Sequence, residues 1–318
     1  MGLRVVLLAS VAVGLEGGLA YAQDSGSYTT ELPPVEVTVP KSGVKPTRQR
    51  SAERVVRPAV TRLRVYPTTP ISTPSTALPV DEVASSINFV DSGQIQRTYS
   101  LNVTDALQQA VPAVNVSEVS GNPFQPNLEF RGYVSSPVSG TPQGLAVYQN
   151  GVRINEAFGD TVNWDLIPTS AIKSVAVVTN NPAYGLNALG GAVTVQMKDG
   201  FSYHGAEIDM MGGSYGRLQG SAQWGKQVDQ FATYVALEGL HDDGFRNFTS
   251  SDIRRFYSDV GYRSENAEFH LNIGAADNKL GAPATTPIEL LNNFWGATYT
   301  TPQRDDNQVA YANLTGKV

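Results

Sequence analysis

Cysteine is absent from the 318 residues of this sequence, and histidine occurs only three times. Without cysteine the chain has no disulfide and no thiolate nucleophile, so it must be held together by size, sheet closure or a membrane. His204, His241 and His270 lie far apart in the chain, and none belongs to an H-E-x-x-H zinc motif. We interpret them as loop and strand residues, and we expect no metal site and no cofactor.

Motifs of the common enzyme classes are missing as well. No G-x-S-x-G elbow occurs, and in "GLNALGGA" Gly191 stands where a P-loop needs its phosphate-binding lysine. The carboxylate pairs Asp242-Asp243 and Glu207/Asp209 fit a solvated loop and the polar side of a strand. The sequence therefore predicts a protein that is not an enzyme.

Excess positive charge and spanning apolar runs are also lacking. The net charge is −6, which argues against nucleic acid as a partner. The apolar run Val5–Leu15 falls short of the roughly 20 residues that span a bilayer. Preceded by Arg4 and followed by Ala20-Tyr21-Ala22, it predicts a cleaved signal peptide over residues 1–22. Export without a spanning helix leaves the periplasm, the cell exterior or an outer membrane crossed by β-strands.

Residues 23–80 do not have the composition of a folded domain. "LPPVEVTVP", residues 32–40, is an apolar, β-competent segment with no neighbouring strand to pair with. The following tract is rich in lysine, arginine and proline, and it buries too little apolar area to order itself. We interpret it as an extended linker. Its positive charge suits either a contact with anionic polymers and lipid head groups or a simple solvated tether.

Folded sequence is expected from residue 81 to about 200, as a compact mixed α/β unit. "LNVTDALQQAVPAV" places Val103, Leu107 and Val111 on one helical face before Pro112 ends the helix. "SSINFV", "VNVSEV", "NLEFRG", "IKSVAVVTN" and "GAVTVQMK" have strand patterns. In "LAVYQNGVRI", Asn150-Gly151 predicts a type I′ hairpin, because both residues tolerate positive φ.

From residue 201 onwards apolar and polar residues alternate, as in "AEIDMM", "RLQGSAQWGK" and "EFHLNIG". We expect strands near 205–211, 217–226, 230–240, 253–262, 267–276 and 307–317. A transmembrane β-barrel and a soluble antiparallel sandwich both produce this alternation. The connections favour the barrel, since the second and fourth are short and the third and fifth are long. Because a bacterial barrel needs at least about eight strands to close, we expect this chain to be the front part of a longer protein.

Aromatic and amide side chains in loops are the best candidates for contact with a ligand. The candidates are Asn122, Phe124, Gln125, Asn155, Phe158 and Trp164, with Phe294 and Trp295 in the longest connection. Exposed rings stack on a polar ligand, while asparagine and glutamine hydrogen-bond to it. Local packing of the loops explains the same residues, and the sequence leaves both interpretations open.

Taken in order, these segments resemble the amino-terminal part of a TonB-dependent outer-membrane receptor. "LPPVEVTV" is similar to the TonB box, and the plug domain is matched by "LNVTDALQQAVPAVNV", "EFRG", "VYQNGVRIN", "IPTSAIKSVAVV" and "YGLNALGGAVTVQMK". The resemblance implies an α/β plug followed by antiparallel transmembrane strands of an incomplete barrel, where the full family barrel has about 22 strands. The implied domains are a signal peptide (1–22), the TonB box and linker (23–80), the plug (81–200) and the first barrel strands (201–318).

The resemblance also implies partners for particular residues. A strand of TonB is expected to pair by β-augmentation with Val35, Glu36, Val37, Thr38 and Val39. Arg131-Gly132 matches the plug's "RG" element, whose arginine pairs with barrel carboxylates, and we expect those partners beyond Val318. The apical plug loops 119–127 and 154–164 correspond to loops that touch substrate in the family.

Two departures from the family pattern are visible. Asn150-Gly151 stands in place of the usual Asp-Gly, a change that a type I′ turn tolerates. "VVTNNPAYG" departs from the more common "RGP" before the tyrosine, which removes any plug contact that depends on that arginine.

The function that the resemblance implies is TonB-dependent uptake of a scarce ligand across the outer membrane, with a ferric siderophore as the expected substrate. The implied partners are TonB, outer-membrane lipid and a small ligand such as a ferric chelate, and the N-terminal segment is expected in the periplasm. A plug-bearing remnant that binds TonB or ligand without transport is the alternative. A soluble secreted β-protein is a third possibility.

Overall fold

A computed structural model of the protein describes residues 64–65, 78–79, 86–179, 181, 184–300 and 303–318. They belong to one compact unit, residues 59–318. The predicted signal peptide (1–22) and the predicted TonB-binding residues (35–39) lie outside the described residues. Within the described ranges, no helix is long and apolar enough to cross a membrane.

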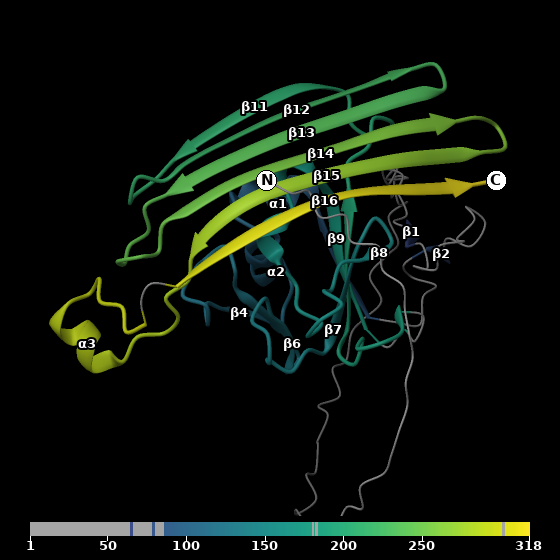
Figure 1. Cartoon of the computed structure of the whole chain (residues 1–318). Coiled ribbons are helices and arrows are strands. Elements are labelled where there is room, and N and C mark those ends of the chain that lie inside the picture. The colour runs from purple at the N-terminus through teal and green to yellow at the C-terminus, as the bar shows by residue number, and fades with distance from the viewer. Residues whose placement is uncertain (1–63, 66–77, 80–85, 180, 182–183, 301–302) are drawn as a thin grey trace, which may run out of the picture. The chain divides into compact units, whose positions relative to one another are not determined.

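The first part of the described chain is an α/β domain built on a five-stranded mixed sheet with the strand order β3-β9-β10-β7-β8 (Figure 1). Strand β10 pairs in parallel with β7 and antiparallel with β9. A separate three-stranded sheet is formed by β4, β5 and β6, and a short antiparallel pair by β1 and β2. The bounds are β1 Arg64–Val65, β2 Leu78–Pro79, β3 Ile87–Asp91, α1 Ser92–Thr98, α2 Val103–Ala110, β4 Val114–Ser117, β5 Asn127–Phe130, β6 Tyr133–Ser135, β7 Leu145–Gln149, β8 Val152–Arg153, β9 Ile172–Val178 and β10 Gly191–Met197.

Helix α2 forms where the sequence predicts it, and helix α1 before it was not predicted. The side chain of Asn102 caps α2 by accepting a hydrogen bond from the backbone of Asp105 at 2.9 Å. Its buried face carries Val103 and Leu107, and the helix ends just before Pro112. Helix α1 begins at a capping box, in which Asp91 and Gln94 each accept from the other's backbone N–H.

The core of this domain is apolar. Strand β9 buries six of its seven residues, because it lies between β3 and β10 in the sheet and its two faces belong to two apolar clusters. Leu107, Leu128, Phe130 and Leu145 are all fully buried in one cluster. The predicted hairpin joins β7 to β8, with φ of 47° at Asn150 and 81° at Gly151, so both turn residues have the positive φ that was expected.

The second part is a six-stranded antiparallel sheet whose strands lie side by side in chain order (Figure 1). All six predicted strands are present: β11 Gly205–Gly212, β12 Leu218–Val228, β13 Phe231–Asp242, β14 Ser251–Arg263, β15 Glu268–Gly281 and β16 Arg304–Lys317. Short turns at 229–230 and 264–267 connect the strands at one end. The connections 213–217, 243–250 and 282–303 lie at the other end, called the long-loop end below, and the last of them contains the unpredicted helix α3 (Ile288–Asn293).

The two faces of the six-stranded sheet differ in chemistry. The inner face contacts the α/β domain, and on β13 it carries Tyr234 and Glu238, both buried. The outward face carries exposed apolar side chains, such as Phe231 and Leu237 on the same strand. Further exposed apolar residues on this face are Ile208, Met210, Leu218, Trp224, Val228, Val260, Phe269, Leu271, Ile273 and Leu314.

Candidate functional site

Loop 119–127 of the α/β domain is bonded to the long-loop end of the sheet. The buried amide of Asn122 donates to the hydroxyl of Ser251 and to the carbonyl of Gly281, both at 2.8 Å. The backbone N–H of Ala284 donates to the carbonyl of Ser120 at 2.8 Å. These contacts fix the loop against strands β14 and β15 and against the connection 282–303.

Arg246, in the connection 243–250, joins loop 119–127 to the connection 282–303. Its guanidinium donates to the carbonyls of Gly121 and Ala284 at 3.1 Å and to the hydroxyl of Thr286 at 3.1 Å. Gly121 has a φ of 76°, and a Cβ at this position would collide with the Arg246 guanidinium and the Ala284 carbonyl. Glycine is therefore required here both by the backbone conformation and by the close approach.

A cavity of about 300 Å³ opens beside this junction. Gly121 and Pro123 line it from the α/β domain. From the sheet it is lined by Tyr215, Arg217, Asp242, Gly244, Phe245, Thr249 and Trp295. Every lining residue of the sheet lies in, or at the border of, one of the three connections at the long-loop end.

Three aromatic rings and one ion pair give this cavity its chemistry. The ring of Phe245 lies 6.3 Å from that of Tyr215 and 6.5 Å from that of Trp295, and all three side chains are exposed. Arg217 forms an ion pair with the buried carboxylate of Asp242, with an Nε–Oδ2 distance of 2.7 Å. The charges of the pair offset each other, so the rings are the main surface available for a ligand.

The structure distributes the predicted ligand residues between core and surface. Asn122, Phe124 and Gln125 are buried, and the side-chain oxygen of Gln125 has no hydrogen-bond partner among the described residues. Phe158 is 84% exposed, whereas Trp164 is fully buried in the core. The assignment of ligand contacts to these residues stays a prediction.

The side chain of Asn155 bonds to strand β7 and to its own loop. Its carbonyl oxygen accepts from the backbone of Val147 at 2.7 Å, and its amide donates to the carbonyls of Leu145 and Asp160 at 3.2 Å. The side chain therefore holds the segment after β8 in place, and loop 154–164 does not line the cavity described above.

A buried ion pair joins the middle of the sheet to the α/β domain. Glu238 on β13 and Arg255 on β14 approach to 3.2 Å, and each side chain is only 2% exposed. Glu238 also accepts from the hydroxyl of Thr169 at 3.1 Å, while Arg255 donates to the carbonyl of Ile167 at 3.1 Å. One oxygen of Glu238 and one nitrogen of Arg255 thus bond both to each other and to the α/β domain.

Asp165 provides a further contact between the two parts. Its carboxylate is buried and accepts from the amides of Asn278 at 2.8 Å and Asn307 at 3.1 Å.

Lys198, at the end of the α/β domain, donates to the carbonyl of Ser170 at 2.7 Å and to the side-chain oxygen of Gln223 on β12 at 2.9 Å. Burial lowers the pKa of Lys198, although nearby carboxylates oppose that shift.

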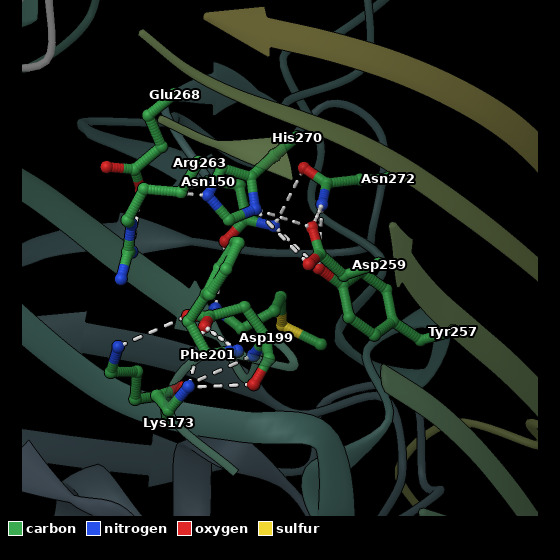
Figure 2. Close-up of polar contacts among 12 residues, drawn as sticks. Asn150, Lys173, Asp199, Phe201, Tyr257, Asp259, Arg263, Glu268, His270 and Asn272 are labelled. Carbon is green, nitrogen blue, oxygen red and sulfur yellow. Dashed lines mark hydrogen bonds and ion pairs between the residues drawn. The ribbon is translucent and has the colours of Figure 1, made fainter. Parts of the chain in front are cut away.

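The tip of the β7–β8 hairpin contacts the inner face of the sheet (Figure 2). The amide of Asn150 donates to the hydroxyl of Tyr257 at 2.9 Å and to the side-chain oxygen of Asn272 at 3.2 Å. Asn272 in turn donates to Asp259 at 2.6 Å. An aspartate at position 150 would form the same turn but would lack these donors, so asparagine has a role here beyond the turn itself.

Arg131 lies at the turn between β5 and β6, with a φ of 52°, followed by Gly132 with a φ of 84°. Its guanidinium sits 5.0 Å from the centre of the Phe130 ring and is exposed. The predicted pairing of Arg131 with barrel carboxylates stays a prediction.

Comparison with known proteins identifies the α/β domain. Residues 79–192 match the family described as TonB-dependent Receptor Plug Domain. The vitamin B12 transporter BtuB of Photobacterium profundum is 26% identical over 246 residues, which cover 71% of this chain and 39% of BtuB. The ferric citrate transporter FecA has a similar structure, with a TM-score of 0.62 at 15% identity, covering 74% of this chain and 37% of FecA. The open form of the ferric-catecholate import receptor Fiu from E. coli K12 is also similar, with a TM-score of 0.56 at 17% identity, covering 80% of this chain and 39% of Fiu.

These findings confirm the resemblance seen in the sequence: residues 79–192 form a plug domain of the kind found in TonB-dependent receptors, and the antiparallel strands that follow have the same fold as the solved receptors. It spans about two fifths of the length of the relatives it matches. The α/β domain is called the plug from here on.

Sequence reasoning missed Tyr215, Arg217 and Phe245, which line the cavity. The signal available was the similar composition of "GSYGR" and "DGFRN", each with a glycine, an aromatic residue and an arginine between two strands. Nothing in the sequence indicated that these two connections and Trp295 would meet, because strand pairing brings them together.

Proposed function

We propose that this chain is the plug-bearing part of a transporter that takes up a scarce ligand through the outer membrane. The observation that carries the proposal is the plug itself, bonded to the inner face of a sheet whose opposite face is apolar. A sheet with an apolar outward face and a polar inner face suits a barrel wall in lipid. In this arrangement the long-loop end faces the cell exterior, because outer-membrane barrels have their short turns on the periplasmic side.

The proposed ligand is a ferric siderophore. It would first meet the cavity at the long-loop end, where Tyr215, Phe245 and Trp295 present exposed rings beside the plug loop 119–127. Aromatic surfaces with a few polar groups suit an organic chelate of this kind. Cobalamin is the competing ligand, since the curated relative is a vitamin B12 transporter.

Gating is proposed to start at Val35–Val39. A strand of periplasmic TonB would add to this segment through main-chain hydrogen bonds, and force on the linker would then act on the plug. To open a path, the plug has to give up contacts with the sheet, including those of Asn150, Asp165 and Thr169. Each is a polar bond that water can replace, so the cost of release is lower than for an apolar interface of the same size.

The test is uptake of radiolabelled iron, supplied as a set of ferric siderophores, by cells that produce the Val37→Pro variant. Proline removes a backbone donor from the added strand, so we expect energised uptake to be lost while surface binding of the chelate is retained. Val44→Pro, in the linker, is the matched control and should leave uptake unchanged. Normal uptake by the Val37→Pro variant would refute the assignment of the TonB box, and uptake of labelled cobalamin instead of iron would replace the proposed ligand.

A further inference from the structure

His270, on β15 near the short turn 264–267, lies between two carboxylates on the inner face of the sheet (Figure 2). Its Nδ1 is 3.0 Å from Oδ2 of Asp259 on β14, and its Nε2 is 3.0 Å from Oε1 of Glu268. An ionised carboxylate can only accept hydrogen bonds, so both ring nitrogens have to carry a proton. The geometry therefore requires His270 to be the charged imidazolium ion.

The carboxylate of Asp259 depends on this charge. Its side chain is 1% exposed, and His270 is its only ion-pair partner in the part of the chain that the structure describes. Glu268 differs, because it is bonded to Arg263 at 2.9 Å and is paired in register with Lys317. A buried carboxylate that loses its cation is strongly destabilised. Loss of the second proton from His270 would leave Asp259 in that state and would set an unprotonated ring nitrogen against Glu268.

The other groups near His270 keep their charge while the imidazole titrates. Asp199 faces it from the end of the plug and forms an ion pair with Lys173 at 3.3 Å. The ring of Phe201 meets the imidazole edge-on at 5.7 Å, and the guanidinium of Arg263 lies 4.0 Å from the centre of that same ring. Carboxylates titrate near about pH 4, and lysine and arginine above about pH 10. Between these limits His270 is therefore the group of this cluster that changes charge.

Asp259 sets the orientation of a row of amides that ends in the plug (Figure 2). Its carboxylate accepts from the amide of Asn272 at 2.6 Å, so Asn272 presents its oxygen to Asn150, whose amide donates to it at 3.2 Å. Asn150 in turn presents its oxygen to the backbone N–H of Met197 on β10, at 2.8 Å. Because each amide has one donating and one accepting end, the direction of the first bond fixes the direction of the others.

We propose that the charge on His270 controls how firmly the tip of the β7–β8 hairpin is attached to the sheet. The imidazolium compensates Asp259, and Asp259 orients Asn272 and Asn150 toward the plug. The attached state holds one proton more than the released state, so attachment is strongest at low pH and weakens as pH rises. Neither the ligand nor TonB takes part in this attachment, which stands apart from the function proposed above.

The experiment is hydrogen exchange of the full chain in non-ionic detergent, read at single residues by mass spectrometry at about pH 6 and about pH 9. Each rate is divided by the intrinsic exchange rate at the same pH, so that protection alone is compared. The N–H of Met197 is the reporter, because it is bonded to the side chain of Asn150. We expect its protection to fall about tenfold or more at the higher pH, the equivalent of one hydrogen bond to a charged group. The N–H of Val193, in the same strand between β7 and β9, should keep its protection.

Variants identify the group that titrates. His270→Gln removes the ring, so the protection of Met197 should be the same at both pH values. Glu268→Gln supplies an amide that can donate to an unprotonated ring nitrogen, so the loss of protection should become smaller. His241→Gln is the matched control, because His241 also bridges two aspartates, at 2.8 and 3.2 Å, but lies at the long-loop end with 51% of its side chain exposed. This control should show the full pH effect.

Equal protection of Met197 at the two pH values in the unmodified protein would overturn the proposal. A pH effect that survives in His270→Gln, or disappears in His241→Gln, would overturn it as well. Loss of protection at Val193 together with Met197 would mean that the whole plug unfolds, which is not the proposed release. If His270→Gln does not fold, Glu268→Gln carries the test, and an undiminished pH effect in that variant would contradict the role of His270.

Discussion

The plug and the six-stranded sheet differ in the side chains that they bury. In the plug, most of the buried residues are apolar, as in β9 and around Leu107. In the sheet, many of the buried residues are polar or charged, such as Glu238, Arg255 and Asn272, while many exposed positions of the same strands are apolar. The difference indicates that the plug folds against water, whereas the outward face of the sheet is suited to lipid and its inner face to polar contact with the plug.

The largest expected effect comes from the buried pair of the inner face. Arg255→Met leaves the carboxylate of Glu238 buried without its cation, so we expect the free energy of unfolding to fall by about 3–5 kcal/mol. It is measured by urea titration of the protein in detergent. Arg254→Met, at the adjacent exposed position, should change it by less than about 0.5 kcal/mol in the absence of lipid.

The double variant Arg255→Met with Glu238→Met sharpens this result. Because it removes both charges together, it should recover most of the lost stability. If the single and double variants are equally unstable, the polar inner face depends on shape rather than on charge pairing.

The plug core should respond as a water-soluble core does. Leu107 is fully buried, and Leu107→Ala should lower the free energy of unfolding by about 2–5 kcal/mol, through lost burial and the cavity left behind. Thermal or urea unfolding followed by near-UV circular dichroism measures the loss. Leu186→Ala is the control, since Leu186 is 80% exposed, and a comparable loss there would contradict the boundary drawn between core and surface.

The free-energy cost of a charged residue on the outward face should depend on the depth of that residue in the membrane. Ile273 lies in the middle of β15, and Ile273→Arg should cost about 2–4 kcal/mol for folding into lipid vesicles. Gln308, on the outward face near the long-loop end, is the matched position, where Gln308→Arg should cost only about 0–1 kcal/mol. Equal and small costs at both positions would mean that this face meets water and that the comparison with the plug is wrong.

The smallest effect is a pH dependence in the plug. Burial raises the pKa of Asp105 from its ordinary 3.8 to about 6, although hydrogen bonds from the backbone of Leu101 and Asn102 oppose the shift. Because the folded state holds this proton more tightly than the unfolded state, its contribution to stability is lost as pH rises from about 4 to about 6. The stability difference between Asp105→Asn and the unmodified protein should therefore shift in favour of the variant over this window, and an unchanged difference from pH 4 to pH 7 would contradict the raised pKa.

Much of the fold could be predicted from local pattern. The helix over "VTDALQQA", the Asn150-Gly151 hairpin and the six strands after residue 201 are present in the structure, because each depends on residues close together in the chain. Helices α1 and α3 were missed, because each spans two turns or less, which is too few residues for a helical period to be detected in the sequence.

The candidate site could be predicted only in part. The aromatic residue Trp295 stood out in its loop, and it lines the cavity. Phe124 and Asn122 stood out equally, yet both are buried, because neighbouring strands and Arg246 close over the loop that carries them. A loop aromatic in the sequence does not reveal which other loop will cover it.

The sequence by itself determined the order of the parts: a plug with an apolar core, followed by strands in which apolar and polar residues alternate. Alternation has a period of two whatever lies against each face, so it could not say which face meets the plug. The tertiary structure decided that, through contacts between residues more than 60 positions apart, such as Thr169 with Glu238 and Asn150 with Tyr257. It also brought three separate connections around one cavity, because hydrogen bonding between strands, and not nearness in the chain, sets which residues become neighbours.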